Sequence, residues 1–147
     1  MKIEVKPGEK LSILVVDDED DIRETLIMFL DMMEIFDFIV QAKDGSEATR
    51  KCQNQNFDII VTDLLMPSVK GIEFIQNLRI QEKRTRVEEF TPIIILSANI
   101  TGEEVQKAIH FGIKNVVTKP CTADEFINKV SEVLLKHKRN KVRVTKD

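Results

Sequence analysis

The sequence of 147 residues has only two cysteines and no apolar run long enough to cross a bilayer. A transmembrane helix needs about 20 predominantly apolar residues in succession, so we expect no membrane contact. Cys52 and Cys121 lack the spacing of a metal site, and a chain of this length does not depend on a disulfide to fold. The first ten residues lack the apolar segment of a secretory signal. We therefore expect two reduced thiols, inert and used for packing, in a cytoplasmic protein.

Positive charge is scarce outside the C-terminal end of the chain. The net charge is −3, but residues 136–147 carry six Lys or Arg and one Asp, so the remainder carries −8. Proteins that bind nucleic acid present a basic patch on one face, and the body of this chain offers none. We expect no nucleic-acid partner for the folded body. The basic end is expected to be a solvated helix end or a linker, with a contact to nucleic acid or to an acidic partner as the alternative.

Five short runs rich in apolar and β-branched residues recur along the chain. They are residues 11–16, 37–42, 57–62, 91–97 and 113–118. The first, third and fourth are apolar at successive positions, which is typical of strands covered on both faces. Helical patterns separate or follow these runs. The sequences TGEE (101–104) and TADE (122–125) contain the Thr and Glu of a capping box, a motif that marks the start of a helix.

The alternation of strands and helices predicts an α/β fold. Such chains form parallel sheets with right-handed crossovers and helices on both faces. We predict a doubly wound sheet of five parallel strands in the order 2-1-3-4-5. The domain is expected to span residues 11–137, with a short N-terminal extension at 1–10 and a basic C-terminal tail at 138–147. Residues 81–90 are expected to form a polar loop or a frayed helix end.

Polar side chains stand where four of the predicted strands end. They are Asp17 and Asp18 after the first strand, Asp63 after the third, Ser97 after the fourth and Lys119 after the fifth. Ligands bind beyond the carboxyl ends of parallel strands, near the point where the strand order reverses, so we expect these side chains to converge. Three neighbouring carboxylates repel one another unless a cation lies between them. Oxygen ligands without nearby His or Cys favour a hard cation, Mg²⁺ rather than Zn²⁺.

The other two side chains suit a phosphoryl group beside that cation. The Lys119 ammonium is a point charge for a phosphate oxygen, and the Ser97 hydroxyl can donate a hydrogen bond to it. One carboxylate would then be the nucleophile, since aspartyl phosphates are established intermediates of covalent catalysis. Asp20 and Asp21 are expected only to complement the positive end of the first helix.

Four motifs resemble the receiver domain of two-component response regulators. They are VVDDE (15–19), DIIVTDLLMPSVKG (58–71), IIILSA (93–98) and VVTKP (116–120), in this order and at matching spacing. The resemblance covers residues 11–137 and implies a flavodoxin-like (βα)5 receiver fold. It implies that Asp63 is the phosphoacceptor, that Asp18 binds Mg²⁺ directly, and that Asp17 acts mostly through a coordinated water.

The resemblance implies roles for further positions at the same site. The main-chain carbonyl of Leu65 would be another Mg²⁺ ligand, Ser97 would be the switch hydroxyl, and Lys119 would contact the phosphoryl group. The peptide bond before Pro120 would be cis, although most bonds to proline are trans.

Several positions depart from the pattern of that family. Val116 stands where an aromatic residue usually rotates with the switch hydroxyl, and the chain contains no tyrosine. Output is therefore expected to run through movement of the loop after the fourth strand and of the helix that follows it. Lys70 replaces an acid common in relatives and should affect only the loop surface. Leu65 and Asn99 occupy positions that control access of water to the acyl phosphate, and the apolar Leu65 predicts a long phosphoryl lifetime.

The resemblance implies a phosphorylation-controlled signalling domain rather than an enzyme, capable at most of self-phosphorylation from small phosphodonors and slow self-dephosphorylation. A histidine kinase or a phosphotransfer protein would supply the phosphoryl group from a phosphohistidine. A downstream protein would bind the face made by the fourth helix, the fifth strand and the fifth helix, and a homodimer is a further expectation.

Two alternatives belong to other classes. A phosphohydrolase of the haloacid-dehalogenase type would use the first Asp of a D-x-D motif after strand one, but the sequence there is VVDDED and no insertion is large enough for a cap domain. A scaffold that signals without phosphorylation would be consistent with Val116, but the complete set of acids and Lys119 disfavours it. His110 and His137 are expected to be surface residues.

Overall fold

A computed structural model of the chain describes residues 2–64, 66, 71–99 and 102–146. In chain order its elements are β1 (Ile3–Val5), β2 (Ser12–Val16), α1 (Asp20–Met33), β3 (Phe38–Ala42), α2 (Gly45–Asn54), β4 (Ile59–Asp63), α3 (Gly71–Thr85), β5 (Ile93–Ser97), α4 (Glu103–His110), β6 (Asn115–Thr118), α5 (Ala123–His137) and β7 (Val142–Val144). All five predicted strands are present, each within one or two residues of its predicted bounds.

The five central strands form one parallel sheet in the order β3-β2-β4-β5-β6. Numbered without the first and last short strands of the chain, this is the predicted order 2-1-3-4-5. The register pairs Val16 with Thr62, Asp63 with Leu96, and Ser97 with Thr118. Strands β2, β4, β5 and β6 therefore end at one common edge of the sheet, where the predicted site residues follow.

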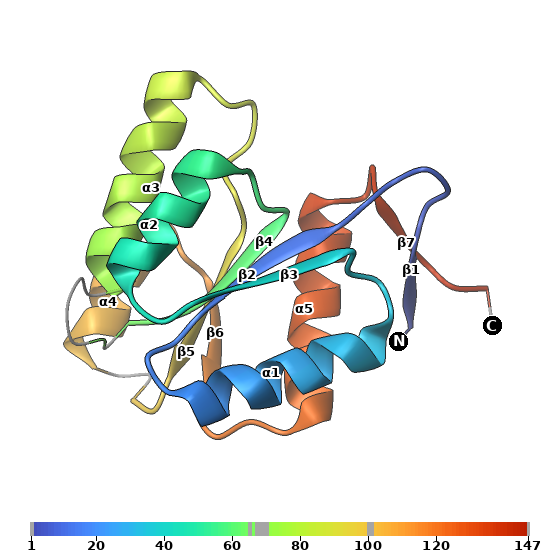
Figure 1. Cartoon of the computed structure of the whole chain (residues 1–147), viewed down its shortest axis with the longest axis horizontal. Helices are drawn as coiled ribbons and strands as arrows, with labels where there is room; N and C mark the ends of the chain where they lie inside the picture. The colour runs from blue at the N-terminus through green and yellow to red at the C-terminus, as the bar shows by residue number, and fades with distance from the viewer. Residues whose placement is uncertain (1, 65, 67–70, 100–101, 147) are drawn as a thin grey trace.

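Helices cover both faces of the sheet, as predicted. In Figure 1, α1 and α5 lie on one side and α2, α3 and α4 on the other. Along β2, Leu14 and Val16 pack in the core under α2, α3 and α4, while Ile13 and Val15 pack under α1 and α5. All four are fully buried. Because successive side chains of a strand point to opposite faces, a strand between two helical layers must be apolar throughout.

One of the two predicted capping boxes is confirmed. At the start of α5 the Thr122 hydroxyl accepts a hydrogen bond from the Glu125 amide at 3.1 Å, and the Glu125 carboxylate accepts one from the Thr122 amide at 3.3 Å. The box predicted at 101–104 is wrong, because the N-cap of α4 is Gly102. The Gly102 amide donates to the Asn99 carbonyl at 3.1 Å, and this turn delays the helix by one residue. Thr101 lies outside the described residues.

Both ends of the chain contain strands where tails were expected. β1 pairs with β7 in an antiparallel ladder that joins Ile3 to Val144 and Val5 to Val142. Ile3 and Val142 are almost fully buried in the core under α1 and α5. Burial of these two side chains accounts for the ordered ribbon, since each such side chain contributes about 1.5–3 kcal/mol. The division of the chain at residues 10 and 137 stays a prediction.

The segment 81–90 is only partly the predicted loop. α3 continues to Thr85, and Glu82 on it is buried. Its carboxylate accepts hydrogen bonds from Arg79 at 2.6 Å and from the Thr91 amide at 2.7 Å. A charge-rich stretch thus forms helix because one of its acids fastens α3 to the chain entering β5.

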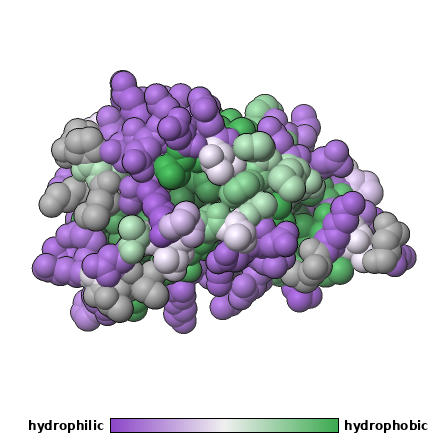
Figure 2. All heavy atoms as spheres, turned by 90° about the horizontal axis from the view of Figure 1, so that it is seen from below, coloured by the Kyte–Doolittle hydropathy of each residue, from purple (hydrophilic) through white to green (hydrophobic). Residues whose placement is uncertain are grey.

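The outer surface of α1 carries exposed methionines. Met28 and Met32 are more than half exposed, so they are not part of the core, whereas Met33 packs against it. The view onto this side of the molecule shows a band of hydrophobic residues among hydrophilic ones (Figure 2).

Candidate functional site

The first part of the site is the turn that leads from β2 into α1. Asp17 is fully buried, whereas Asp18, the next residue, is exposed. The Asp17 amide donates to the Ala42 carbonyl of β3 at 3.1 Å, so the turn is tied to the neighbouring strand. One carboxylate oxygen of Asp17 accepts a hydrogen bond from the Glu19 amide at 2.9 Å. Asp17 is therefore held by its main chain and by its side chain.

The second part is Asp63, the last residue of β4. It is only 8% exposed, and the start of α3 lies directly against its main chain. A Cβ added to Gly71 would lie 2.2 Å from the Asp63 carbonyl oxygen and 2.7 Å from the Leu64 Cα. Such contacts are far shorter than van der Waals distances, so only glycine fits at position 71. The glycine of the motif 58–71 thus lets helix and strand approach closely behind Asp63.

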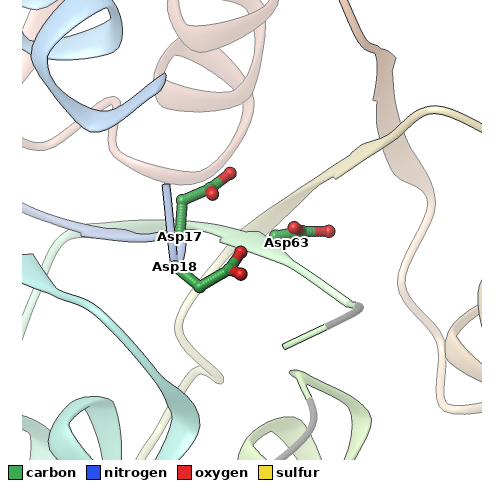
Figure 3. A group of neighbouring side chains, drawn as sticks. All are labelled: Asp17, Asp18 and Asp63. Atoms are coloured by element: carbon green, nitrogen blue, oxygen red, sulfur yellow. The ribbon is translucent and has the colours of Figure 1, made fainter. Parts of the chain in front are cut away.

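The three aspartates come together as predicted. Ligand oxygens of Asp17, Asp18 and Asp63 all lie within 4.8 Å of one another. Figure 3 shows the three carboxylates projecting from the ends of β2 and β4 into the same space. Since like charges at this distance repel one another, a neighbouring cation would stabilise the group. Its ligands are hard oxygens only, which fits Mg²⁺ or a similar cation.

Lys119 follows β6 at the same edge of the sheet and supplies one positive charge. Its ammonium donates to Asp17 at 2.7 Å and to Asp63 at 3.0 Å. Burial by itself lowers the pKa of the Lys119 ammonium, but the hydrogen bonds and charges of Asp17 and Asp63 outweigh this effect and raise the pKa above its usual value. Lys119 is therefore a fixed cation at neutral pH. The peptide bond that follows it, to Pro120, is cis, as predicted.

Ser97 ends β5 at the same edge of the sheet. It is 8% exposed, and its hydroxyl lies 3.0 Å from the Asn99 carbonyl, to which it donates. The Asn99 amide lies 3.1 Å from the same hydroxyl oxygen. The hydroxyl thus belongs to a local turn formed by Ser97 and Asn99.

Two predicted participants lie outside the described residues, namely Leu65 and Lys70. Val116 is half-buried and packs against the core under α2, α3 and α4. Asp20 and Asp21 lie in the first turn of α1, as expected. His137 is half-buried and lies 3.1 Å from the carboxylate of Glu89.

The two cysteines take no part in the site. Burial, followed by the charge of Glu82, raises the pKa of the Cys52 thiol to about 12. Burial, followed by the charge of Glu125, raises the pKa of Cys121 as well. Thiols with raised pKa values are poor nucleophiles at neutral pH, which agrees with the expected packing role.

Sequence reasoning missed Arg23 and Gly71. Arg23, in the first turn of α1, donates to the Asp17 carbonyl at 2.6 Å and to the Gln41 side chain at 3.1 Å. The signal for Gly71 was present, because a glycine at the end of a strand–loop motif often marks a close backbone approach. No pattern in the sequence indicates that Arg23 reaches back to the loop before its own helix.

Comparisons with known proteins agree with this geometry. The family model described as "Response regulator receiver domain" matches residues 13–131. The transcriptional regulatory protein ResD of Bacillus subtilis (strain 168) is 38% identical over 124 residues, which are 83% of this chain and 47% of ResD. This chain thus spans about half the length of that relative.

Solved structures show the same likeness. The chemotaxis protein CheY4 of Vibrio cholerae superimposes with a TM-score of 0.75 at 29% identity, covering 86% of this chain and all of CheY4. A CheX–CheY–BeF3–Mg²⁺ complex from Borrelia burgdorferi contains a chain with a TM-score of 0.74 at 28% identity, covering 86% of this chain and 91% of that one. This chain belongs to the response regulator receiver domain family, whose members are signalling domains. Among the described residues no helix is both long and apolar enough to cross a bilayer.

Proposed function

We propose that this receiver domain accepts a phosphoryl group on Asp63 in a reaction that requires Mg²⁺ held by Asp17, Asp18 and Asp63. The observation that carries the proposal is the meeting of three carboxylates within 4.8 Å, with Lys119 donating to two of them. Among the described residues, Lys119 is the ammonium that contacts these carboxylates, and one ammonium cannot neutralise three carboxylates, so a divalent cation would balance the remaining negative charge. The main-chain carbonyl of Leu65 is the proposed fourth ligand of Mg²⁺, on the basis of the sequence resemblance alone.

In the proposed reaction an Asp63 carboxylate oxygen attacks the phosphorus of a phosphohistidine. An O–P bond to Asp63 forms while the P–N bond breaks, and the imidazole leaves with the bonding electrons. When bound, Mg²⁺ supplies charge neutralisation to the phosphoryl oxygens. Lys119, already 3.0 Å from Asp63, is placed to bind a phosphoryl oxygen once the acyl phosphate has formed.

The proposed output starts at Ser97. A new phosphoryl group adds about −1.5 to −2 charge, and the Ser97 hydroxyl would leave its turn with Asn99 to donate to it. The loop after β5 and helix α4 would follow, altering the face made of α4, β6 and α5. A downstream protein is the proposed reader of that face, with homodimerisation as a second possible consequence. The proposed donor is a histidine kinase or phosphotransfer protein in the cytoplasm.

The scaffold alternative predicts a different response to a phosphoryl mimic. Amide NMR spectra of the ¹⁵N-labelled chain, recorded with Mg²⁺ before and after addition of beryllium fluoride, separate the two functions. The proposal predicts shifts at Asp63, at Ser97 and along α4, and no shifts in Asp63→Asn. Unchanged spectra of the parent chain would favour a scaffold. Steady release of phosphate from a generic phosphomonoester would instead favour a phosphohydrolase.

A further inference from the structure

Arg23 cross-links three separate parts of the chain beside the acidic cluster. Its guanidinium donates to the main-chain carbonyl of Asp17 at 2.6 Å and to the Gln41 side chain of β3 at 3.1 Å. A third bond goes to the carboxylate of Asp20, three residues earlier on α1. The Arg23 side chain is only 12% exposed, so the guanidinium is largely shielded from water.

The carbonyl that Arg23 holds belongs to the peptide group joining Asp17 to Asp18. The orientation of this peptide sets the direction in which both side chains leave the main chain. On its other side Asp17 is fixed by the bond from its amide to the Ala42 carbonyl, at 3.1 Å. Gln41 and Ala42 are neighbours on β3, so Arg23 and the Asp17 amide fasten the turn to the same end of one strand.

We infer that Arg23 is a positioning residue for the metal site, which orients the carboxylates of Asp17 and Asp18 by holding the peptide between them against β3. The inference rests on the proposed Mg²⁺ site. Residues that hold metal ligands in place commonly contribute 10- to 100-fold to metal affinity without touching the metal.

The charge of Arg23 and its geometry predict opposite effects on Mg²⁺ binding. A guanidinium near three carboxylates repels a divalent cation, so its removal would tighten binding if charge alone mattered. Loss of the held peptide would weaken binding. Lysine keeps the charge but lacks the planar fork that reaches three acceptors at once, so Arg23→Lys separates the two effects.

The test is calorimetric titration with Mg²⁺ alone of the parent, Arg23→Ala, Arg23→Lys and Gln41→Met, with Arg143→Ala as the matched control. Arg143 pairs with Glu4 at 2.8 Å on the distant β1–β7 ribbon. Positioning predicts that the Kd for Mg²⁺ rises about tenfold in Arg23→Ala and severalfold in Arg23→Lys. Gln41→Met, which removes one anchor of Arg23, should show a smaller rise, and Arg143→Ala none.

If the Kd of Arg23→Ala for Mg²⁺ is equal to or lower than that of the parent, Arg23 has no positioning role. Binding of Mg²⁺ by the parent would in that case still support the metal site. A parent that binds no Mg²⁺ overturns both. Far-ultraviolet circular dichroism checks folding. If Arg23→Ala does not fold, Arg23→Lys decides, since a folded lysine variant with parental affinity also contradicts positioning.

Discussion

An aspartate paired with a lysine lies at each end of β4, but the two pairs differ in their surroundings. Asp58 precedes the strand and Asp63 ends it, and both are nearly buried. Asp58 forms a salt bridge with the Lys141 ammonium at 3.0 Å, and Asp63 forms one with the Lys119 ammonium at 3.0 Å. A carboxylate bonded to a lysine therefore does not by itself distinguish a functional aspartate from a structural one.

The difference lies in the balance of charge around each carboxylate. Asp58 faces two ammonium groups, with Lys138 at 3.8 Å, and also accepts the Ser12 amide at 2.9 Å. Asp63 shares Lys119 with Asp17 and lies beside Asp18. Asp58 links β2, β4 and the C-terminal segment through these partners. At the Asp63 end, carboxylates outnumber the ammonium groups among the described residues, which favours binding of a cation.

Exchange of each aspartate for asparagine should produce the largest difference between the two ends of β4, in phosphoryl transfer. Asp63→Asn removes the nucleophile, and Asp58→Asn leaves it in place. We expect Asp63→Asn to abolish incorporation of phosphoryl groups from acetyl phosphate with Mg²⁺, while Asp58→Asn is labelled at the parental rate. Intact-mass measurement over time follows both. Labelling of Asp63→Asn at the parental level would refute the assignment of the nucleophile.

Removal of the two lysines should produce stability losses of different size and different response to Mg²⁺. Lys119→Met leaves the buried Asp17 carboxylate without its partner, which costs about 3 kcal/mol for a buried pair. Lys141→Met should cost about 1 kcal/mol, because Lys138 and the Ser12 amide still serve Asp58. Urea unfolding measures both.

Added Mg²⁺ stabilises every variant whose folded state binds it, so each variant is compared with the parent at the same Mg²⁺ concentration. The deficit of Lys119→Met relative to the parent should shrink, because Mg²⁺ replaces the lost positive charge, whereas the deficit of Lys141→Met should stay the same. Deficits that shrink equally would contradict the contrast between the two ends of the strand.

Asp58→Asn should lower the free energy of unfolding by about 2 kcal/mol, because a buried charged hydrogen-bond acceptor is lost. Asp63→Asn should cost less, since the exchange also relieves repulsion with Asp17 and Asp18. Urea unfolding without Mg²⁺ compares them. A larger loss in Asp63→Asn than in Asp58→Asn would show that the carboxylates at the site are balanced in the absence of metal.

The smallest expected effect concerns alkaline pH. The pKa of Lys119 is raised in the folded chain above its ordinary value of 10.5. A raised pKa contributes stability that is complete below the unfolded pKa and is lost as the pH rises through the folded one. The parent should therefore lose stability relative to Lys119→Met as the pH rises above about 10.5. Unfolding curves at a series of pH values would show it, and a constant difference would contradict it.

The sheet and the site could be predicted because they depend on local patterns. Continuous apolar runs such as 93–96 occur where both faces of a strand are covered, and polar residues at the strand ends must then meet at one edge. The placing of Asp17, Asp18, Asp63 and Lys119 followed from strand order alone. The cis bond before Pro120 came from family resemblance and from no local physical signal.

The missed features depend on contacts between distant residues. Pairing of β1 with β7 joins the two ends of the chain, and three-residue strands are too short to show a periodic pattern. Glu82 is buried because it meets Arg79 and the Thr91 amide, which composition cannot reveal. α4 begins at Glu103 with Gly102 as its N-cap, and the Gly102 amide is already bonded in a turn to the Asn99 carbonyl, which the capping-box pattern does not indicate.

The central claim is that Asp63 is the residue that receives the phosphoryl group and that it requires the neighbouring metal site. Treatment with acetyl phosphate, reductive trapping of the acyl phosphate with borohydride and mass analysis of the peptides would locate the group directly. We expect a single modified residue, Asp63, in the presence of Mg²⁺, and no modification in EDTA. Modification of another residue, or undiminished modification of Asp63 in EDTA, would contradict it.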